Sequence, residues 1–173
     1  PTVVGFFLLM TIGPLGPVGA PVLEIFGVRL TMTWYSAIFA TAIVSFPLMY
    51  RSARGAFESL DPNMLDAART LGWSNGRIFM RLMLPLAWSS IASGTVLAFA
   101  RALGEFGCTL FLAGNQLGST RTIPIAIYFE WMNGNTDVAI FWTVVIMAFS
   151  FVVILFINLW SRLTTSYRRG MEA

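Results

Sequence analysis

LDPNMLDAARTLGWSNGRIFMRLMLP, residues 60–85, is a charged, helix-patterned segment in a chain that is 57% hydrophobic and only 11% charged. Runs without any charge surround it, at 32–50, 82–100 and 138–160. Each run is close to the roughly 20 apolar residues that cross a hydrocarbon core about 30 Å thick. One such run alone could be the buried core helix of a soluble protein. Three in a chain of 173 residues indicate an all-α integral membrane protein.

The polar segment itself predicts a hairpin of two short helices. Asp61 is a good N-cap, and Pro62 suits the first helical position because an N–H there would be unpaired in any case. Gly72 supplies the left-handed conformation that closes the first helix. Ser74 can cap the second helix, and Pro85 marks the entry to the next apolar run. A polar helical hairpin between two spans is therefore expected.

The arginines predict the orientation of the chain. Eight of the eleven basic residues fall in segments 51–81 and 161–173, and three fall in the other polar connections. Basic residues kept on the cytoplasmic side usually determine membrane topology. The hairpin and the C-terminal end should therefore face the cytoplasm. The net charge of +3 reports this topology and gives no reason to expect a nucleic-acid ligand.

The remaining segments complete a predicted topology. Residues 1–12 are apolar but too short to span, so we interpret them as the end of a helix that begins outside this sequence, and the chain as a fragment. A membrane domain would cover 1–163, followed by a basic cytoplasmic tail at 164–173. Between the spans, the composition predicts an external turn at 13–21, a helix over about 86–108, a loop at 113–122, a short element at 123–129, and an N-cap at Asp137.

Composition also excludes several kinds of chemistry. The chain has one cysteine, Cys108, and no histidine, so an internal disulfide, a cysteine zinc cluster and histidine-based catalysis are not expected. It also lacks lysine and the G-x-x-x-x-G-K-[ST] pattern of an ATP-binding loop. We therefore expect no cofactor, no metal and no enzymatic activity in this chain.

The hairpin carries a longer pattern with a known counterpart. Asp66-Ala67-Ala68, three residues, Gly72, nine residues, then Leu82-x-Leu84-Pro85 strongly resembles the EAA loop of ABC importer permeases. In that family the pattern is Glu-Ala-Ala, three residues, Gly, nine residues, Ile-x-Leu-Pro. Asp for Glu and Leu for Ile keep the charge and the apolar character. The alternative is a hairpin that merely connects two spans.

The resemblance implies a fold and a set of partners. The fold would be the helical bundle of a type I ABC importer permease, with the hairpin as its coupling helix. The family's coupling loop sits in a groove on a cytoplasmic ATPase subunit, which carries the ATP chemistry. The resemblance further implies a bacterial inner-membrane protein that works as a homodimer, with two ATPase subunits inside and a substrate-binding protein outside.

Segments beyond the hairpin narrow the resemblance to one branch. LAFARALGEFGCTLFLAGN (97–115), TRTIPIAIY (120–128) and SFPLMYRSARGAFESLDP (45–62) are similar to the molybdate/sulfate permeases. TRTIPIAIY is closer to the molybdate members. The implied function is molybdate import by alternating access, with a sulfate or thiosulfate permease as the nearest alternative. From other classes, a passive anion channel and a membrane scaffold stay open, and flux without ATP would favour the channel.

A few polar residues could contact a permeating anion. Arg101 and Glu105 are four apart on a predicted helix, so they should share one face. Ionisable residues in or near a span usually face protein or a water-filled path. The pair could serve as a pore or gate element, or simply as an ion pair that holds the bundle together. The polar run that follows adds the remaining candidates, which are Asn115, Gln116, Ser119, Thr120 and Arg121; Arg121 could also face a binding protein from an external loop.

Overall fold

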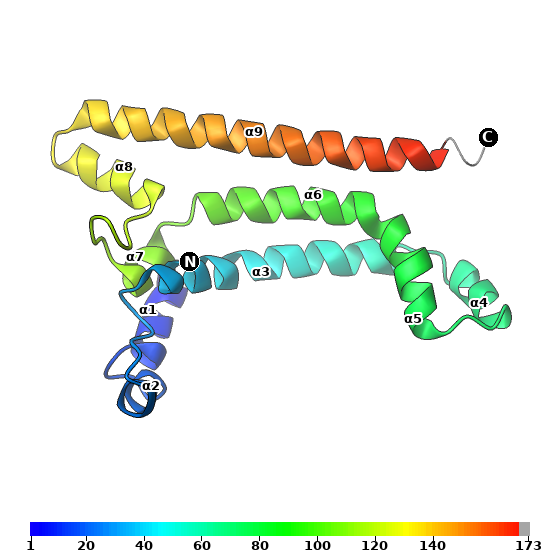
Figure 1. Ribbon diagram of the computed structural model, residues 1–173, viewed down its shortest axis with the longest axis horizontal. Coiled ribbons are helices and arrows are strands. Elements are labelled where there is room, and N and C mark those ends of the chain that lie inside the picture. The colour runs from blue at the N-terminus through cyan, green and yellow to red at the C-terminus, as the bar shows by residue number, and fades with distance from the viewer. Residues whose placement is uncertain (170–173) are drawn as a thin grey trace. The chain divides into compact units, whose positions relative to one another are not determined.

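A computed structural model describes the backbone of residues 1–169 and the side chains of residues 1–160. Within 1–169 all regular structure is helical, which confirms the all-α prediction (Figure 1). The elements run in the order α1 (Thr2–Ile12), α2 (Gly19–Phe26), α3 (Trp34–Glu58), α4 (Pro62–Thr70), α5 (Asn75–Ile78), a π-helical segment η1 (Phe79–Met83), α6 (Leu84–Leu103), α7 (Gly107–Ala113), α8 (Ile123–Met132) and α9 (Thr136–Arg169).

The chain forms two compact units. The first comprises residues 1–45 and 100–151, and the second comprises residues 46–99 and the chain from Val152. Helices α3, α6 and α9 each begin in one unit and continue into the other. Helix α9 also runs without a break through 163–164, where we predicted the change from membrane domain to tail.

Close helix contact at glycines organises the first unit. A Cβ added to Gly5 of α1 would lie 2.6 Å from Cα of Cys108 in α7, and one added to Gly107 would lie 2.6 Å from Oγ1 of Thr2. Small residues allow helix backbones to approach in this way. Cys108, Leu112 and Ala40 form the core. Helix α7 is therefore held directly against α1.

The second unit is built on a similar contact between α3 and α6. A Cβ on Gly94 would lie 2.3 Å from Cβ of Ser52, so only glycine permits this spacing. Ala56 of α3 and Ala87 of α6 are also buried. The rings of Phe57 and Phe79 lie 5.6 Å apart and connect α3 to η1. These contacts give the hairpin a fixed base.

Two helices end at positions other than those predicted. Helix α3 continues to Glu58, past the apolar run that ends at residue 50, and Arg54 and Glu58 in its last turns form an i, i+4 ion pair of 2.7 Å. Helix α6 ends at Leu103, and not near 108. The chain breaks at Gly104, which disfavours helix, and restarts as α7. The length of an apolar run indicates how much of the chain can lie in a membrane. It does not indicate the residue at which a helix ends.

Two smaller predictions also need correction, and a third is confirmed. Helix α2 occupies part of the stretch predicted as a turn, and it is closed by Gly27 at φ 64°. Asp137 lies inside the first turn of α9, which begins at Thr136, so it is not the N-cap. Pro85 lies in the first turn of α6, at the entry to the apolar run, as predicted. Its missing N–H and bulky ring are accommodated by the wider π-helical turn, in which Leu84 N–H donates to Phe79 O, and the chain continues directly into α6.

Candidate functional site

The hairpin has the local structure that its sequence predicts. The carboxylate of Asp61 accepts the N–H of Asn63 at 2.9 Å, and Pro62 opens α4. Gly72 has φ 76°, with nothing within 4 Å of an added Cβ. Ser74 Oγ accepts the N–H of Arg77 at 3.4 Å. The capping predictions are confirmed, and they make the hairpin a defined shape rather than a loose connection.

The two alanines of the pattern face different ways. Ala68 is buried, on the same face as the half-buried Met64 and Leu65, whereas Ala67 is exposed. Asp66 is also exposed, and its carboxylate pairs with Arg69 within α4 at 2.6 Å. The hairpin therefore offers a small side chain, Ala67, beside an internally neutralised charge pair. Such a surface lets a partner approach closely without having to bury an unpaired charge.

An apolar residue extends this surface at the tip of the hairpin. Leu71 is 75% exposed, immediately before the turn at Gly72. Met80 is also exposed, farther along the second helical segment. Exposed apolar groups on a polar hairpin are typical of a surface that contacts another protein.

The second half of the pattern has a different position. Leu82 lies in η1, and Leu84 and Pro85 open α6; all three are half-buried. They do not share the exposed surface of Ala67. Their place in the structure is the wide turn through which α5 passes into α6, visible as a bend in Figure 1. The first half of the pattern thus contains the exposed residues Asp66 and Ala67. The second half lies in the turn that sets the direction of α6.

In the first unit, Arg101 and Glu105 form the ion pair that their spacing predicts. Arg101 Nη2 lies 2.8 Å from Glu105 Oε2, with the side chains 33% and 1% exposed. Glu105 Oε1 also accepts the N–H of Cys108 at 2.8 Å. The carboxylate therefore serves an N–H in the first turn of α7 that has no helical partner, while it neutralises Arg101.

A cavity of about 200 Å³ adjoins this carboxylate. Hydroxyl-bearing residues contribute to its wall, among them Thr109 and Thr122, whose buried Oγ1 atoms have no hydrogen-bond partner among the described residues. Thr109 is only 1% exposed. Buried hydroxyls are normally paired, so these two are available to a polar guest such as water or a permeating ion. Sequence reasoning missed both, because neither belongs to a local pattern.

The other predicted pore residues form a separate cluster. Arg121 Nε donates to Asn115 Oδ1 at 2.8 Å, and its Nη1 lies 2.7 Å from Glu130 Oε1. Thr120 is buried, and its hydroxyl accepts the N–H of Gln116 at 3.1 Å. The Arg121 side chain is only 15% exposed. Arg121 does lie in a loop, but its guanidinium ties that loop to α8 instead of extending outward.

This cluster predicts a pH dependence of stability. Hydrogen bonds from Asn135 and Arg121 lower the pKa of Glu130 below its ordinary value. A carboxyl with a lowered folded-state pKa stabilises the fold above its unfolded pKa, about 4.3, and this contribution is lost as the pH falls through the folded pKa. We expect Tm of the purified protein to fall as the pH drops below about 4.3. Glu130→Gln should lower Tm at pH 7 and flatten this dependence; an unchanged acid profile would contradict the prediction.

Comparison with known proteins identifies the family. Residues 1–164 match the family of binding-protein-dependent transport system inner membrane components. The chain belongs to this family. In this inner membrane component, Asn75–Leu103 and Thr136–Trp160 are long and apolar enough to span a membrane, with mean hydropathies of 1.6 and 2.8. Helix α3 is long enough but ends in the charged residues Arg51, Arg54 and Glu58, and it is not among these candidate spans.

Several curated relatives are transport permeases. YvgM of Bacillus subtilis (strain 168), a provisionally named molybdenum transport system permease protein, is 43% identical over 158 residues, which are 91% of this chain and 70% of that protein. ModB of Escherichia coli (strain K12), the molybdenum transport system permease protein, is 47% identical over 74% of this chain and 56% of its own length. ModB of Mycobacterium tuberculosis (strain ATCC 25618 / H37Rv) is 36% identical over 90% of this chain and 58% of its own length. The chain thus spans little more than half the length of the two ModB proteins. Transport permeases of this kind are not themselves enzymes.

Proposed function

We propose that this chain is the permease subunit of an ATP-driven importer that carries molybdate across the cytoplasmic membrane by alternating access. The observation that carries the proposal is the identity of 43–47% to permeases named for molybdenum transport. TRTIPIAIY (120–128) supports the same substrate, and in the structure it supplies both Thr122 of the cavity and Arg121 of the polar cluster. The named relatives give no support to the sulfate alternative.

The experiment that tests this function is an uptake assay in cells that lack their own molybdate permease. The protein, produced with its ATPase and its binding protein, should restore molybdate accumulation measured by elemental analysis. Excess sulfate should compete poorly. Accumulation that persists without the ATPase would favour a passive anion channel, and strong competition by sulfate would assign the protein to the sulfate permeases.

In such an importer, the hairpin and the two partner proteins would have distinct roles. The hairpin 60–85 would dock on the ATPase through Ala67 and Leu71, so that ATP-driven closure of two ATPases moves two copies of this chain. The ATPase would hydrolyse the ATP, since this chain has no phosphate-binding loop. An external binding protein would select the oxyanion, because a path with a few donors discriminates weakly between tetrahedral dianions, and specificity is a difference of affinities.

The pair of Arg101 and the buried Glu105 would act near the path of the ion. Its net charge is zero while the carboxylate holds the guanidinium, and the cavity beside it presents hydroxyl donors. An anion that approached Arg101 would compete with Glu105 for the same donors. We propose that the pair takes part in gating. It also stabilises the helix break at Gly104, between the end of α6 and the start of α7.

The orientation of the hairpin can be tested by labelling. Ser59 and Ser119 are both exposed, and the native Cys108 is fully buried, so cysteines at these two positions should dominate the reaction. In intact cells, Ser59→Cys should react with a membrane-permeant maleimide and resist an impermeant one. Ser119→Cys should react with both. Labelling of Ser59→Cys by the impermeant reagent would invert the topology and remove the basis for coupling through the hairpin.

A further inference from the structure

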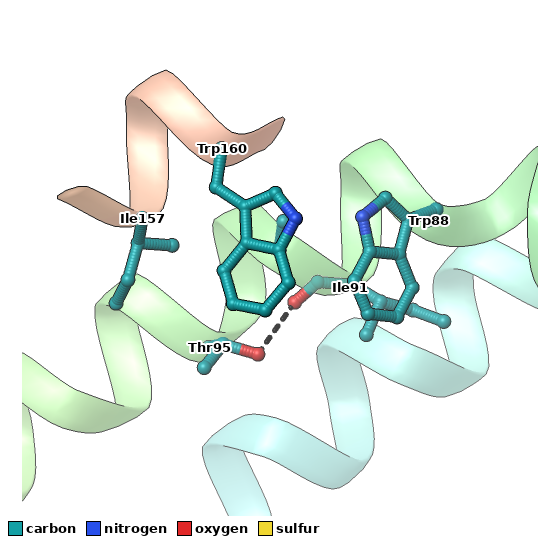
Figure 2. A pocket seen from close by; sticks show the side chains of 6 residues that line it. Trp88, Ile91, Thr95, Ile157 and Trp160 are labelled. Atoms are coloured by element: carbon teal, nitrogen blue, oxygen red, sulfur yellow. Dashed lines mark hydrogen bonds between the residues drawn. The ribbon is translucent and has the colours of Figure 1, made fainter. Parts of the chain in front are cut away.

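The second unit contains an apolar groove between α6 and α9. It has a volume of about 200 Å³ and is lined by Trp88, Ile91, Ala92, Thr95, Ile157 and Trp160. Figure 2 shows the two indoles on opposite sides of the groove, with their nitrogen atoms on the edges that face one another. The volume is below the roughly 300–1,000 Å³ of ordinary small-molecule pockets. The groove is suited to a narrow apolar group.

Apart from the two indole N–H groups, the wall of this groove is apolar (Figure 2). The hydroxyl of Thr95 donates to the carbonyl of Ile91 in its own helix at 2.9 Å, so it is turned away from a guest (Figure 2). Trp88 is 37% and Trp160 is 58% exposed. Tryptophan combines a large apolar ring with one N–H donor, which suits the boundary between acyl chains and headgroups. A ligand with many polar groups would lose its hydration here with little compensation.

The two sequence segments that line the groove contain no acidic residue. No acidic residue occurs between Asp66 and Glu105, and none between Asp137 and Glu172. The helical segment that leads into α6 carries the exposed residues Arg77 and Arg81. Arg81 precedes Trp88 by seven residues, or about 10 Å along a helix. Arg77 and Arg81 therefore place positive charge on the helical segment that leads into the groove.

We propose that this groove is a binding site for one anionic phospholipid. One acyl chain lies between Trp88 and Trp160, and the phosphate headgroup is bound by Arg77 and Arg81. The membrane setting follows from the family, the apolar wall selects a hydrocarbon chain, and the charge selects an anionic headgroup. Basic sites between membrane-spanning helices are suited to such headgroups. The proposal is independent of the transported ion.

The test uses the groove tryptophans as reporters. The protein is reconstituted in phosphatidylcholine vesicles that contain increasing fractions of phosphatidylglycerol brominated in its acyl chains, and tryptophan fluorescence is recorded. A specific site predicts a component of quenching that saturates at a low fraction of the brominated lipid. Brominated phosphatidylcholine should lack this component and quench in proportion to its fraction, as bulk lipid does.

Three variants keep both reporters. Ala92→Phe fills the groove and should abolish the saturable component, whereas Ser93→Phe adds the same bulk at an adjacent exposed position outside the groove and should retain it. Arg81→Gln should weaken the preference for phosphatidylglycerol. Equal, non-saturating quenching by both lipids, or a saturable component that survives Ala92→Phe, would overturn the proposal. So would protection of the groove from every brominated lipid, since a second copy or another protein segment would then cover it.

Discussion

Replacing Ala67 by aspartate should leave the hairpin folded and abolish ATP-driven uptake. Ala67 is exposed on α4, and the capping bonds of Asp61 and Ser74 lie elsewhere, so the substitution removes no contact of the chain itself. In a docked complex the new carboxylate would be buried without a partner, which costs several kcal/mol. Every 1.4 kcal/mol is a factor of ten in affinity, so docking should weaken by more than about a hundredfold.

The measurement is co-purification of the ATPase with the membrane protein, together with uptake in the same cells. Ala67→Ser is the matched control, because serine is nearly as small and carries no charge; it should retain both properties. Ala68→Asp provides the contrast, since Ala68 is buried and a charge there should lower the yield of folded protein. Normal uptake and ATPase retention by Ala67→Asp would reduce the hairpin to a connector.

Replacing Glu105 by alanine should destabilise the protein more than any exposed substitution. The carboxylate is 1% exposed and makes two bonds, one to Arg101 and one to the N–H of Cys108. Removing one member of a buried ion pair typically costs about 3–5 kcal/mol, and we expect the lower end because Arg101 keeps some contact with solvent. The free energy of unfolding in mixed micelles would measure the loss.

Two further variants separate the two bonds of Glu105. Glu105→Gln retains an oxygen for the N–H of Cys108 and loses only the charge, so it should cost less than alanine. The double variant of Arg101 and Glu105 to alanine should cost less than the sum of the single variants, because neither charge is then left alone. A loss below about 1 kcal/mol for Glu105→Ala would contradict the role of the pair as a structural link between α6 and α7.

Local chemistry made the hairpin predictable. Asp61, Gly72 and Ser74 act through neighbours within a few residues, so their roles follow from sequence position alone. The ends of the longer helices were not predictable from hydropathy. Helix α3 continues through the polar turn that holds Arg54 and Glu58, and a π-helical turn at Phe79–Met83 leads directly into α6.

The polar site was predictable only in part, for a related reason. Spacing predicts that Arg101 and Glu105 share a face, but it does not predict that the carboxylate is the buried member. Arg121 and Glu130 lie nine residues apart across a loop, so no helical rule brings them together. Thr109 and Thr122 meet at one cavity only because α7 folds back beside the start of α8. Such long-range contacts require the tertiary structure.

Uptake into reconstituted vesicles that contain this protein, its ATPase and its binding protein would test most directly whether it is a molybdate importer. Labelled molybdate and labelled sulfate would be supplied at equal concentration on the binding-protein side, with ATP on the side of the ATPase. We expect molybdate to accumulate only with ATP, and sulfate to accumulate far more slowly. Accumulation of sulfate at an equal or greater rate, or of molybdate without ATP, would contradict the proposed function.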